Sequence, residues 1–139
     1  MQVELVSPEQ IVWTGDATQV IARTLDGDIA FLEGHAPFIG ALAVATVRVW
    51  PVDPTDGEVV ALAVHGGFVE VSGSAASGST VTIIADVAEL GSEIDVERAN
   101  EARERADRAV QAESDDAEAA AALKRAETRI LASQGGVAN

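Results

Sequence analysis

The sequence predicts a mainly β chain with a helical end: an N-terminal β-sandwich, or flattened barrel, over residues 1–91, followed by a C-terminal antiparallel two-helix hairpin over residues 92–139. Turn residues support this division, because ten of the 12 glycines and all 4 prolines precede Ser92, and none lies between Ser92 and Gln134. Charge changes at the same place. Residues 1–93 carry 2 bases against 13 acids, whereas residues 94–139 carry 7 bases against 10 acids.

Short apolar or alternating runs separated by turn residues predict the strands of the first part. These runs are residues 3–6, 11–13, 18–24, 28–32, 44–50, 59–64, 68–71 and 81–85. In the run 44–50, a period of two puts Val47 and Val49 on one face and turns Arg48 toward water. Dipeptides that supply positive φ angles for tight turns stand between runs: Asp26-Gly27, Asp56-Gly57 and Gly66-Gly67. Strands spaced this closely are typical of a sandwich or a flattened barrel.

The second part changes to a helical period. Asp95 is a good N-cap, and Ala99, Ala102, Ala106 and Ala109 then recur at spacings of three and four. A break at residues 114–116 offers a second cap. After it a stripe follows on a second helix, formed by Ala119, Leu123, Ala126 and Ile130, and Gly135-Gly136 ends that helix.

The alanine seam predicts a helical pair that is weakly held. Alanine lets two backbones approach closely but buries little area, and burial contributes about 25 cal/mol per Å². The pair should therefore be marginal by itself and able to dock on, or leave, the β domain at modest cost.

Composition excludes several classes of protein. The formal net charge is −14, which opposes binding to nucleic acid or to an anionic membrane surface through a basic face. With no Cys there is no disulfide framework, thiolate nucleophile or cysteine zinc site. Charge-free runs such as residues 34–47 are too short to span a bilayer, and the N-terminus lacks the basic region of a signal peptide. We expect a soluble intracellular protein without direct membrane insertion.

Motifs for catalysis and for metal binding are weak. His35 stands beside Glu33, so the two side chains are candidates for a general acid/base pair, although we favour an exposed turn residue. His65 ends an apolar strand and is expected to be structural. Two histidines thirty residues apart are a poor metal signal, and no Walker-type glycine loop or nucleophile elbow occurs. The larger aromatic residues are expected to fill the core or a partner face: Trp13, Trp50, Phe31, Phe38 and Phe68. We predict no catalytic site and no metal.

Several stretches resemble one known family. The segment 27–37, GDIAFLEGHAP, followed by the segment 66–71, GGFVEV, resembles the N-terminal domain of the ε subunit of F-type ATP synthases. The segments 93–99, 104–106 and 122–129 resemble the helical hairpin of that family, in the same order along the chain. The resemblance implies a non-catalytic rotor subunit at the cytoplasmic face of the bacterial plasma membrane, within a proton-translocating ATP synthase.

Partners and a regulatory role are implied by the same resemblance. The sandwich would hold the γ subunit to the ring of c subunits, through the segment Glu33, Gly34, His35, Ala36 and Pro37. The hairpin would extend toward the catalytic α and β subunits and oppose ATP hydrolysis. Its contacts with the β subunit would come from Lys124, Arg125 and Arg129. No cofactor is required.

A regulatory ATP is also implied, because some members of the family bind it on the folded hairpin through an Ile-Asp-x-x-Arg-Ala motif. The motif stands here as Ile94, Asp95, Arg98 and Ala99. The family's other nucleotide contacts imply four further residues at similar positions: Glu89, Arg105, Arg125 and Arg129. The spacing of the arginines is compatible, because Arg125 and Arg129 project from one helix face. The same residues also fit a solvated, ion-paired helix surface, with pairs such as Arg98 with Glu101 and Glu104 with Arg108.

Two departures from the family pattern bear on these expectations. Glu33 stands where the family commonly has proline, and the turn between the helices is short. Ten acids against 7 bases in the tail also weaken the case for strong inhibition. Two rival functions remain: a stand-alone acidic β-sandwich that binds a basic partner, and a small hydrolase that uses His35.

Overall fold

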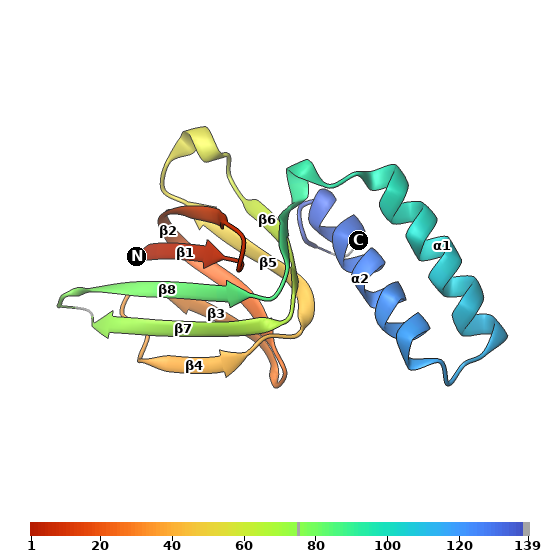
Figure 1. Cartoon of the computed structure of the whole chain (residues 1–139). Helices are drawn as coiled ribbons and strands as arrows, with labels where there is room; N and C mark the ends of the chain where they lie inside the picture. Colours follow the sequence, from red (N-terminus) through yellow and green to blue (C-terminus); the bar gives the residue numbers. More distant parts are fainter. Residues whose placement is uncertain (75, 138–139) are drawn as a thin grey trace.

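The computed structural model describes residues 1–74 and 76–137, and in them a β domain precedes two α-helices (Figure 1). The strands are β1 (Gln2–Val6), β2 (Ile11–Thr24), β3 (Gly27–Leu32), β4 (Phe38–Ala41), β5 (Val44–Pro51), β6 (Val60–His65), β7 (Gly67–Ser74), β8 (Gly78–Ala85) and β9 (Ala88–Leu90). Short 3-10 turns lie at Pro54–Asp56 and Gly91–Glu93, and the helices are α1 (Val96–Ala112) and α2 (Ala117–Ser133). The predicted order, a β-sandwich followed by a helical pair, is confirmed.

The long strand β2 belongs to both layers of the sandwich. Its first half pairs with β1, which continues through β8 and β7 to β4. Its second half pairs with β3 on one side and with β5 on the other, and β5 continues through β6 to β9. A register irregularity between Ala17 and Gln19 marks the change of layer, as β-bulges commonly do. β1 and β8 are parallel, while the other pairs are antiparallel.

The core fills the space between these two layers with large apolar side chains from the strands. Phe31, Leu5, Leu62 and Ile83 are among its largest fully buried members. Val47 and Val49 also point into it, as their alternation with Arg48 predicts. The buried members of this core all lie in the β domain, so within the described residues it is complete without the helices.

Three strand predictions differ from the structure. Residues 11–13 and 18–24 form one continuous strand, because Gly15 and Asp16 pair with Val3 and Gln2 in spite of their turn-forming character. The short strands β4 and β9 were not predicted. Both lie at sheet edges, where a few residues pair with one neighbour and carry little periodic signal.

Both helices begin at an aspartate cap, as predicted. A side-chain oxygen of Asp95 accepts from the amide of Arg98 at 3.1 Å, and one of Asp116 accepts from the amide of Ala119 at 3.0 Å. Figure 1 shows the two helices antiparallel, with α2 lying against the sandwich and α1 on its outer side. None of the described helices combines the length and the apolar character needed to cross a bilayer.

Small side chains make part of the contact between α2 and the sandwich, while Leu131 of α2 and Ile21 of β2 line a pocket in the same interface. Along β6, Leu62 and Val64 point into the core, whereas Ala61, Ala63 and His65 are buried on the opposite face. α2 packs against β6 and β5, and its residues Ala126, Thr128 and Ala132 are also buried. The tail of α2 is tied to β5 by a hydrogen bond of 3.0 Å from the Thr46 hydroxyl to the Gly136 carbonyl. The predicted weakly held helical pair is therefore docked in this structure.

Candidate functional site

A pocket of about 400 Å³ lies where the start of α1 meets the later turns of α2 and strand β9. Seven of the eight residues predicted to contact ATP line it, and the exception is Arg125. The lining residues are Glu89, Glu93, Ile94, Asp95, Arg98, Ala99, Ala102, Arg105 and Arg129. Residues from the linker and from both helices are thus brought together only because the hairpin is docked.

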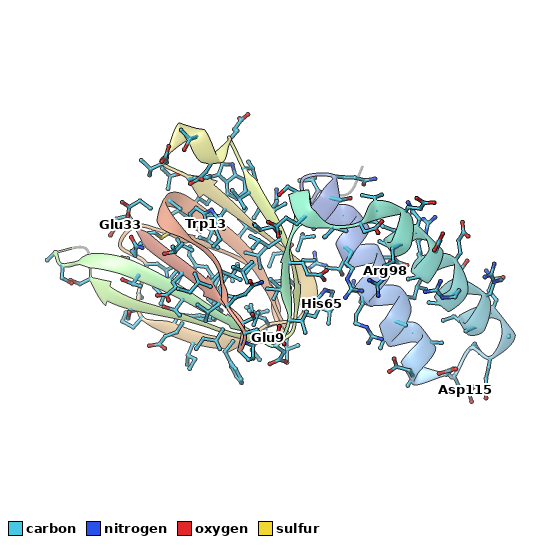
Figure 2. The ribbon with its side chains drawn as sticks, turned by 45° about the horizontal axis from the view of Figure 1, so that its top comes forward. Glu9, Trp13, Glu33, His65, Arg98 and Asp115 are labelled. Carbon is cyan, nitrogen blue, oxygen red and sulfur yellow. The ribbon has the colours of Figure 1, made fainter. Side chains whose placement is uncertain are left out.

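The arginines of this pocket are held differently. Arg98 and Arg105 are seven residues apart on α1, and both are exposed; Figure 2 labels Arg98 on this helix. Neither makes an ion pair with another residue of the described chain. The Nε of Arg129 instead donates to the Glu89 carboxylate at 2.8 Å. Two uncommitted guanidinium groups therefore face the pocket, and these are the donors that phosphate groups prefer.

Glu89 is the link between the sandwich and α2. The oxygen that accepts from Arg129 also lies 3.1 Å from Nε2 of His65. Figure 2 shows His65 at the side of the sandwich that faces the helices. The other ring nitrogen, Nδ1, is buried and finds no hydrogen-bond partner among the described residues. The neutral tautomer with its proton on Nε2 satisfies this geometry, since Nδ1 then carries no hydrogen.

Burial lowers the pKa of His65 below its ordinary value of 6.5, and the positive charge of Arg129 lowers it further. The hydrogen bond to Glu89 opposes these effects. A protonated ring would place an N–H on the unpartnered side, so the neutral form is favoured in the docked structure. The expectation that His65 is structural fits its buried position.

Asp95 has one carboxylate oxygen committed to the cap of α1, and that carboxylate lines the pocket. Glu89, Glu93 and Asp95 together balance the formal charges of Arg98, Arg105 and Arg129. The pocket is therefore mixed in charge. A triphosphate would have to be held by the α1 arginines, since Arg129 already serves Glu89.

Arg125 lies outside this pocket and lines its neighbour, which it shares with Arg105 and Arg129. Its guanidinium donates to Glu118 at 2.8 Å. The pairs predicted from sequence, Arg98 with Glu101 and Glu104 with Arg108, do not form within the described residues. The ion pairs of α2 reach seven residues along the helix and across to the sheet instead, which the local spacing rule does not cover.

The three residues expected to contact the β subunit point in different directions. Lys124 lines a pocket against the outer face of β5, whereas Arg125 and Arg129 line the pockets toward α1. In the docked hairpin these three cations therefore do not form one surface.

The segment Glu33 to Pro37 lies far from the hairpin, and Figure 2 shows Glu33 at the other end of the sandwich. Glu33 is held by the amine of Met1 at 2.9 Å and by the amide of Ser79 at 2.8 Å. These bonds lower the pKa of Glu33, the one from the amine most. Glu33, which stands where the family commonly has proline, thus connects the chain end before β1 with strand β8.

His35 closes the turn at Glu33 and Gly34, as expected, with its amide donating to the Leu32 carbonyl at 3.0 Å, but its side chain is not fully exposed. Its ring lies half-buried, 5.0 Å from the ring centroid of Phe31 and 6.2 Å from that of Phe38. Its Nδ1 lies 2.7 Å from the Ala36 carbonyl, while Glu33 is engaged with Met1 and Ser79. The His35–Glu33 acid/base pair required by the hydrolase alternative therefore does not form in the described residues.

The remaining aromatic residues divide between core and surface. Trp13 and Phe31 are buried, and Phe38 packs against the core. Trp50 lies under the guanidinium of Arg48, whose carbon is 5.3 Å from the ring centroid. Phe68 is 56% exposed. No group of three or more metal-ligating side chains is found in residues 1–74 and 76–137.

His65 belongs to the contacts that join the sandwich to α2, a place that the sequence did not predict. Its partner Glu89 was implied by the family resemblance, but the strand β9 that carries Glu89 was not predicted. The pairing of Ala63 with Glu89 and of Val64 with Ala88 is what brings this carboxylate beside His65. A histidine at the end of an apolar strand, with an acidic residue in the next segment to pair with that strand, was the available signal for the contact between His65 and Glu89.

Comparison with known proteins identifies the family. Residues 1–91 match the family described as ATP synthase, Delta/Epsilon chain, beta-sandwich domain. An ATP synthase epsilon chain from Streptomyces avermitilis is 41% identical over 132 residues, which are 95% of this chain and 94% of that protein. The epsilon chain of Rhodococcus jostii is 44% identical over 125 residues, covering 89% of this chain and 90% of that one.

Solved structures agree. A chain in the mitochondrial ATP synthase of Euglena gracilis, in a structure of its OSCP, F1 and c-ring, superposes with a TM-score of 0.72 and 25% identity. The match covers 91% of this chain and 76% of that chain. A chain from the Tetrahymena thermophila mitochondrial ATP synthase shares the fold, with a TM-score of 0.56, 15% identity and coverage of 68% and 69%. The chain therefore belongs to the ATP synthase epsilon-chain family, as an accessory subunit of the enzyme complex without a catalytic site of its own.

Proposed function

We propose that this chain is a central-stalk rotor subunit of a proton-translocating F-type ATP synthase, at the cytoplasmic face of the bacterial plasma membrane. In this role its sandwich holds the γ subunit to the c-subunit ring, and its helical hairpin acts on the α and β subunits to oppose ATP hydrolysis. The proposal is supported by the names of its relatives and by the domain order that it shares with them.

The observation that carries the regulatory part is the way the hairpin is docked. α2 rests on Ala61, Ala63 and His65 of β6 through its own alanines, and the core does not depend on it. One partly exposed ion pair, Arg129 with Glu89, ties it to β9. A contact with few large side chains, one ion pair and the hydrogen bond from Thr46 to Gly136 stabilises the docked state by a modest free energy. A partner or ligand can therefore shift the equilibrium by its differential affinity.

Reconstitution tests this function. The catalytic complex of α, β and γ subunits is assembled with and without the chain, and its ATP hydrolysis is measured. Addition of the chain should slow hydrolysis, and Glu89→Gln, which removes the anchor of Arg129, should slow it further because more hairpins extend. Glu118→Gln is the matched control, because its partner Arg125 lies on the same helix. Unchanged hydrolysis on adding the chain would contradict the inhibitory role.

We also propose that ATP is a regulatory ligand of the pocket between α1, α2 and β9. Arg98 and Arg105 would hold the phosphates, and the oxygen of Asp95 that is left by the cap would accept from the adenine amino group. Because both helices and the linker line the pocket, ATP would bind the docked hairpin and stabilise it.

Calorimetric titration of the full chain with ATP and Mg²⁺ tests this ligand. Arg98→Ala and Arg105→Ala should weaken binding about tenfold or more, as loss of a charge-assisted hydrogen bond does. Arg103→Ala is the control, because Arg103 is exposed on the same helix and does not line the pocket. Absence of heat at millimolar ATP with the wild-type chain would remove the nucleotide site while leaving the rotor role intact.

A further inference from the structure

A second pocket lies on the other side of α2, between this helix and the outer face of strands β2, β3 and β5. Its volume is about 170 Å³, and it shares no lining residue with the pocket proposed for ATP. Four of its ten lining residues are charged, namely Arg23, Asp28, Arg48 and Lys124. It therefore requires an explanation of its own.

Strand register and helical period bring these charges together. Arg23 pairs with Asp28 across β2 and β3, and Ile21 pairs with Arg48 across β2 and β5. Residues that pair directly, or that lie two apart on a strand, share a face. Arg23 and Arg48 therefore lie on the outer face that α2 covers, and Lys124 reaches the same space from the helix.

The local charge is opposite to that of the whole chain. Three bases and one acid give this pocket a formal charge of +2, in a chain of net charge −14. Arg23 and Arg48 are also the 2 bases found in residues 1–93. The fold thus gathers both bases of the β domain under one helix that adds a third.

The three cations are not equally free. Arg23 is held by Asp28 through two hydrogen bonds, of 2.8 and 3.1 Å. The side chains of Arg48 and Lys124 form no ion pair with any described residue. Arg48 is kept in place by Trp50, which lies 5.3 Å from its guanidinium carbon. Stacking on an aromatic ring fixes the plane of a guanidinium and leaves its N–H edge available.

We propose that this pocket binds a compact tetrahedral oxyanion, inorganic phosphate, between Arg48 of the sheet and Lys124 of α2. The Arg23–Asp28 pair forms the wall, and its remaining N–H groups add donors. A volume less than half that of the first pocket suits phosphate better than a nucleoside triphosphate. Phosphate binding in this pocket goes beyond the proposed rotor and nucleotide functions. It rests on a separate set of lining residues, so it can be tested independently of them.

Phosphate in this position would join the sheet to the hairpin. Because its two main contacts come from different parts of the fold, it would bind the docked state and not the extended one. A ligand that binds only the docked state lowers the free energy of that state. Once the ligand concentration exceeds its Kd, the stabilisation grows with the logarithm of the concentration. The pocket would then make hairpin docking sensitive to phosphate concentration.

The test is a titration of the full chain with inorganic phosphate at constant ionic strength, followed by amide chemical shifts. The wild-type chain should bind, and Arg48→Gln and Lys124→Gln should each weaken binding about tenfold, since each removes a charge-assisted contact. Lys124 is exposed, so its variant keeps the fold even if Arg48→Gln does not. Arg103→Gln, which alters an exposed base that lines neither pocket, should bind as the wild type does.

The double variant Arg98→Gln/Arg105→Gln separates the two pockets, because it removes the free cations of the first one and should leave phosphate binding unchanged. Binding that survives Lys124→Gln, or that disappears in the double variant, would overturn the proposal. So would binding of ATP, but not of phosphate, that depends on Lys124.

Discussion

His65 and Arg129 share one carboxylate oxygen of Glu89, which lies 3.1 Å from Nε2 of the histidine and 2.8 Å from Nε of the arginine. One acidic side chain on a short edge strand therefore serves a buried histidine of the sandwich and the anchoring arginine of α2. Protonation of the histidine would bring a second positive charge beside Arg129.

Stability should fall as the pH is lowered below about 6.5. The pKa of His65 is lowered in the folded chain by burial and by Arg129, so the unfolded chain binds more protons in this range. The contribution of neutral His65 to stability is fully present above pH 6.5, the ordinary pKa of histidine. It is lost as the pH falls from there through the lower pKa of His65 in the folded chain. Urea unfolding at several pH values measures this loss. His65→Gln, which keeps a donor for Glu89, should show a shallower pH dependence, and parallel profiles would contradict the assignment.

Glu89 and Arg129 should be energetically coupled. Both side chains are about one-third exposed, so we expect a coupling of about 1 kcal/mol, reduced from the buried limit by solvent screening. A double-mutant cycle with Glu89→Gln and Arg129→Gln, read from unfolding midpoints, gives this value. The pair Glu118 and Arg125 has the same 2.8 Å separation, but Glu118 is 80% exposed. Its cycle should give less than about 0.5 kcal/mol, and equal couplings would refute the anchoring role.

Gly91→Ala should loosen the end of α2. A Cβ at this position would overlap the backbone carbonyl of Ala132, which cannot move without shifting the helix. We expect a cost of about 1–3 kcal/mol, as for other overpacked sites, and faster amide exchange over residues 126–133. Ser92→Ala is the control, because Ser92 is the exposed neighbour of Gly91. If Gly91→Ala left amide exchange in α2 unchanged, the close approach would have no energetic role.

Asp116→Ala should destabilise α2 by about 1 kcal/mol, because it removes the oxygen that accepts from the Ala119 amide. Asp115→Ala removes the same charge one residue earlier, where no capping bond is formed within the described residues. Helical content from circular dichroism and the thermal midpoint should change in the first variant and hardly in the second. Equal changes would assign the effect to charge near the helix start instead of to the cap.

Much of the fold could be predicted because its signals are local. The aspartate caps, the alternation around Arg48 and the loss of glycine after Ser92 each act over a few residues. β4 and β9 escaped prediction because short edge strands are defined by their partners. The continuity of β2 through Gly15 escaped for the same reason, since its pairing with Val3 overrides the low strand preference of glycine.

The sequence predicted most residues that line the candidate site, but not the contacts between them. The family resemblance located Arg98 and Arg105, yet nothing in the spacing indicated that Arg129 binds Glu89 forty residues away. The sequence gives even less indication of the pocket around Arg48 and Lys124. This pocket forms only when the strand register and the docking of α2 act together. Local spacing predicted helix-surface ion pairs for Arg98 and Glu104 that the structure does not form.

The alanines on the outer face of β6 have a consequence for the moment when α2 leaves. Separation would expose Ala61 and Ala63 of β6 to water. Their methyl groups add little apolar area, whereas large exposed apolar patches promote aggregation. A sandwich stripped of its helices would thus stay dispersed in water. If the hairpin opens and closes as proposed, each opening would expose little apolar area on β6, which limits the risk of misassociation.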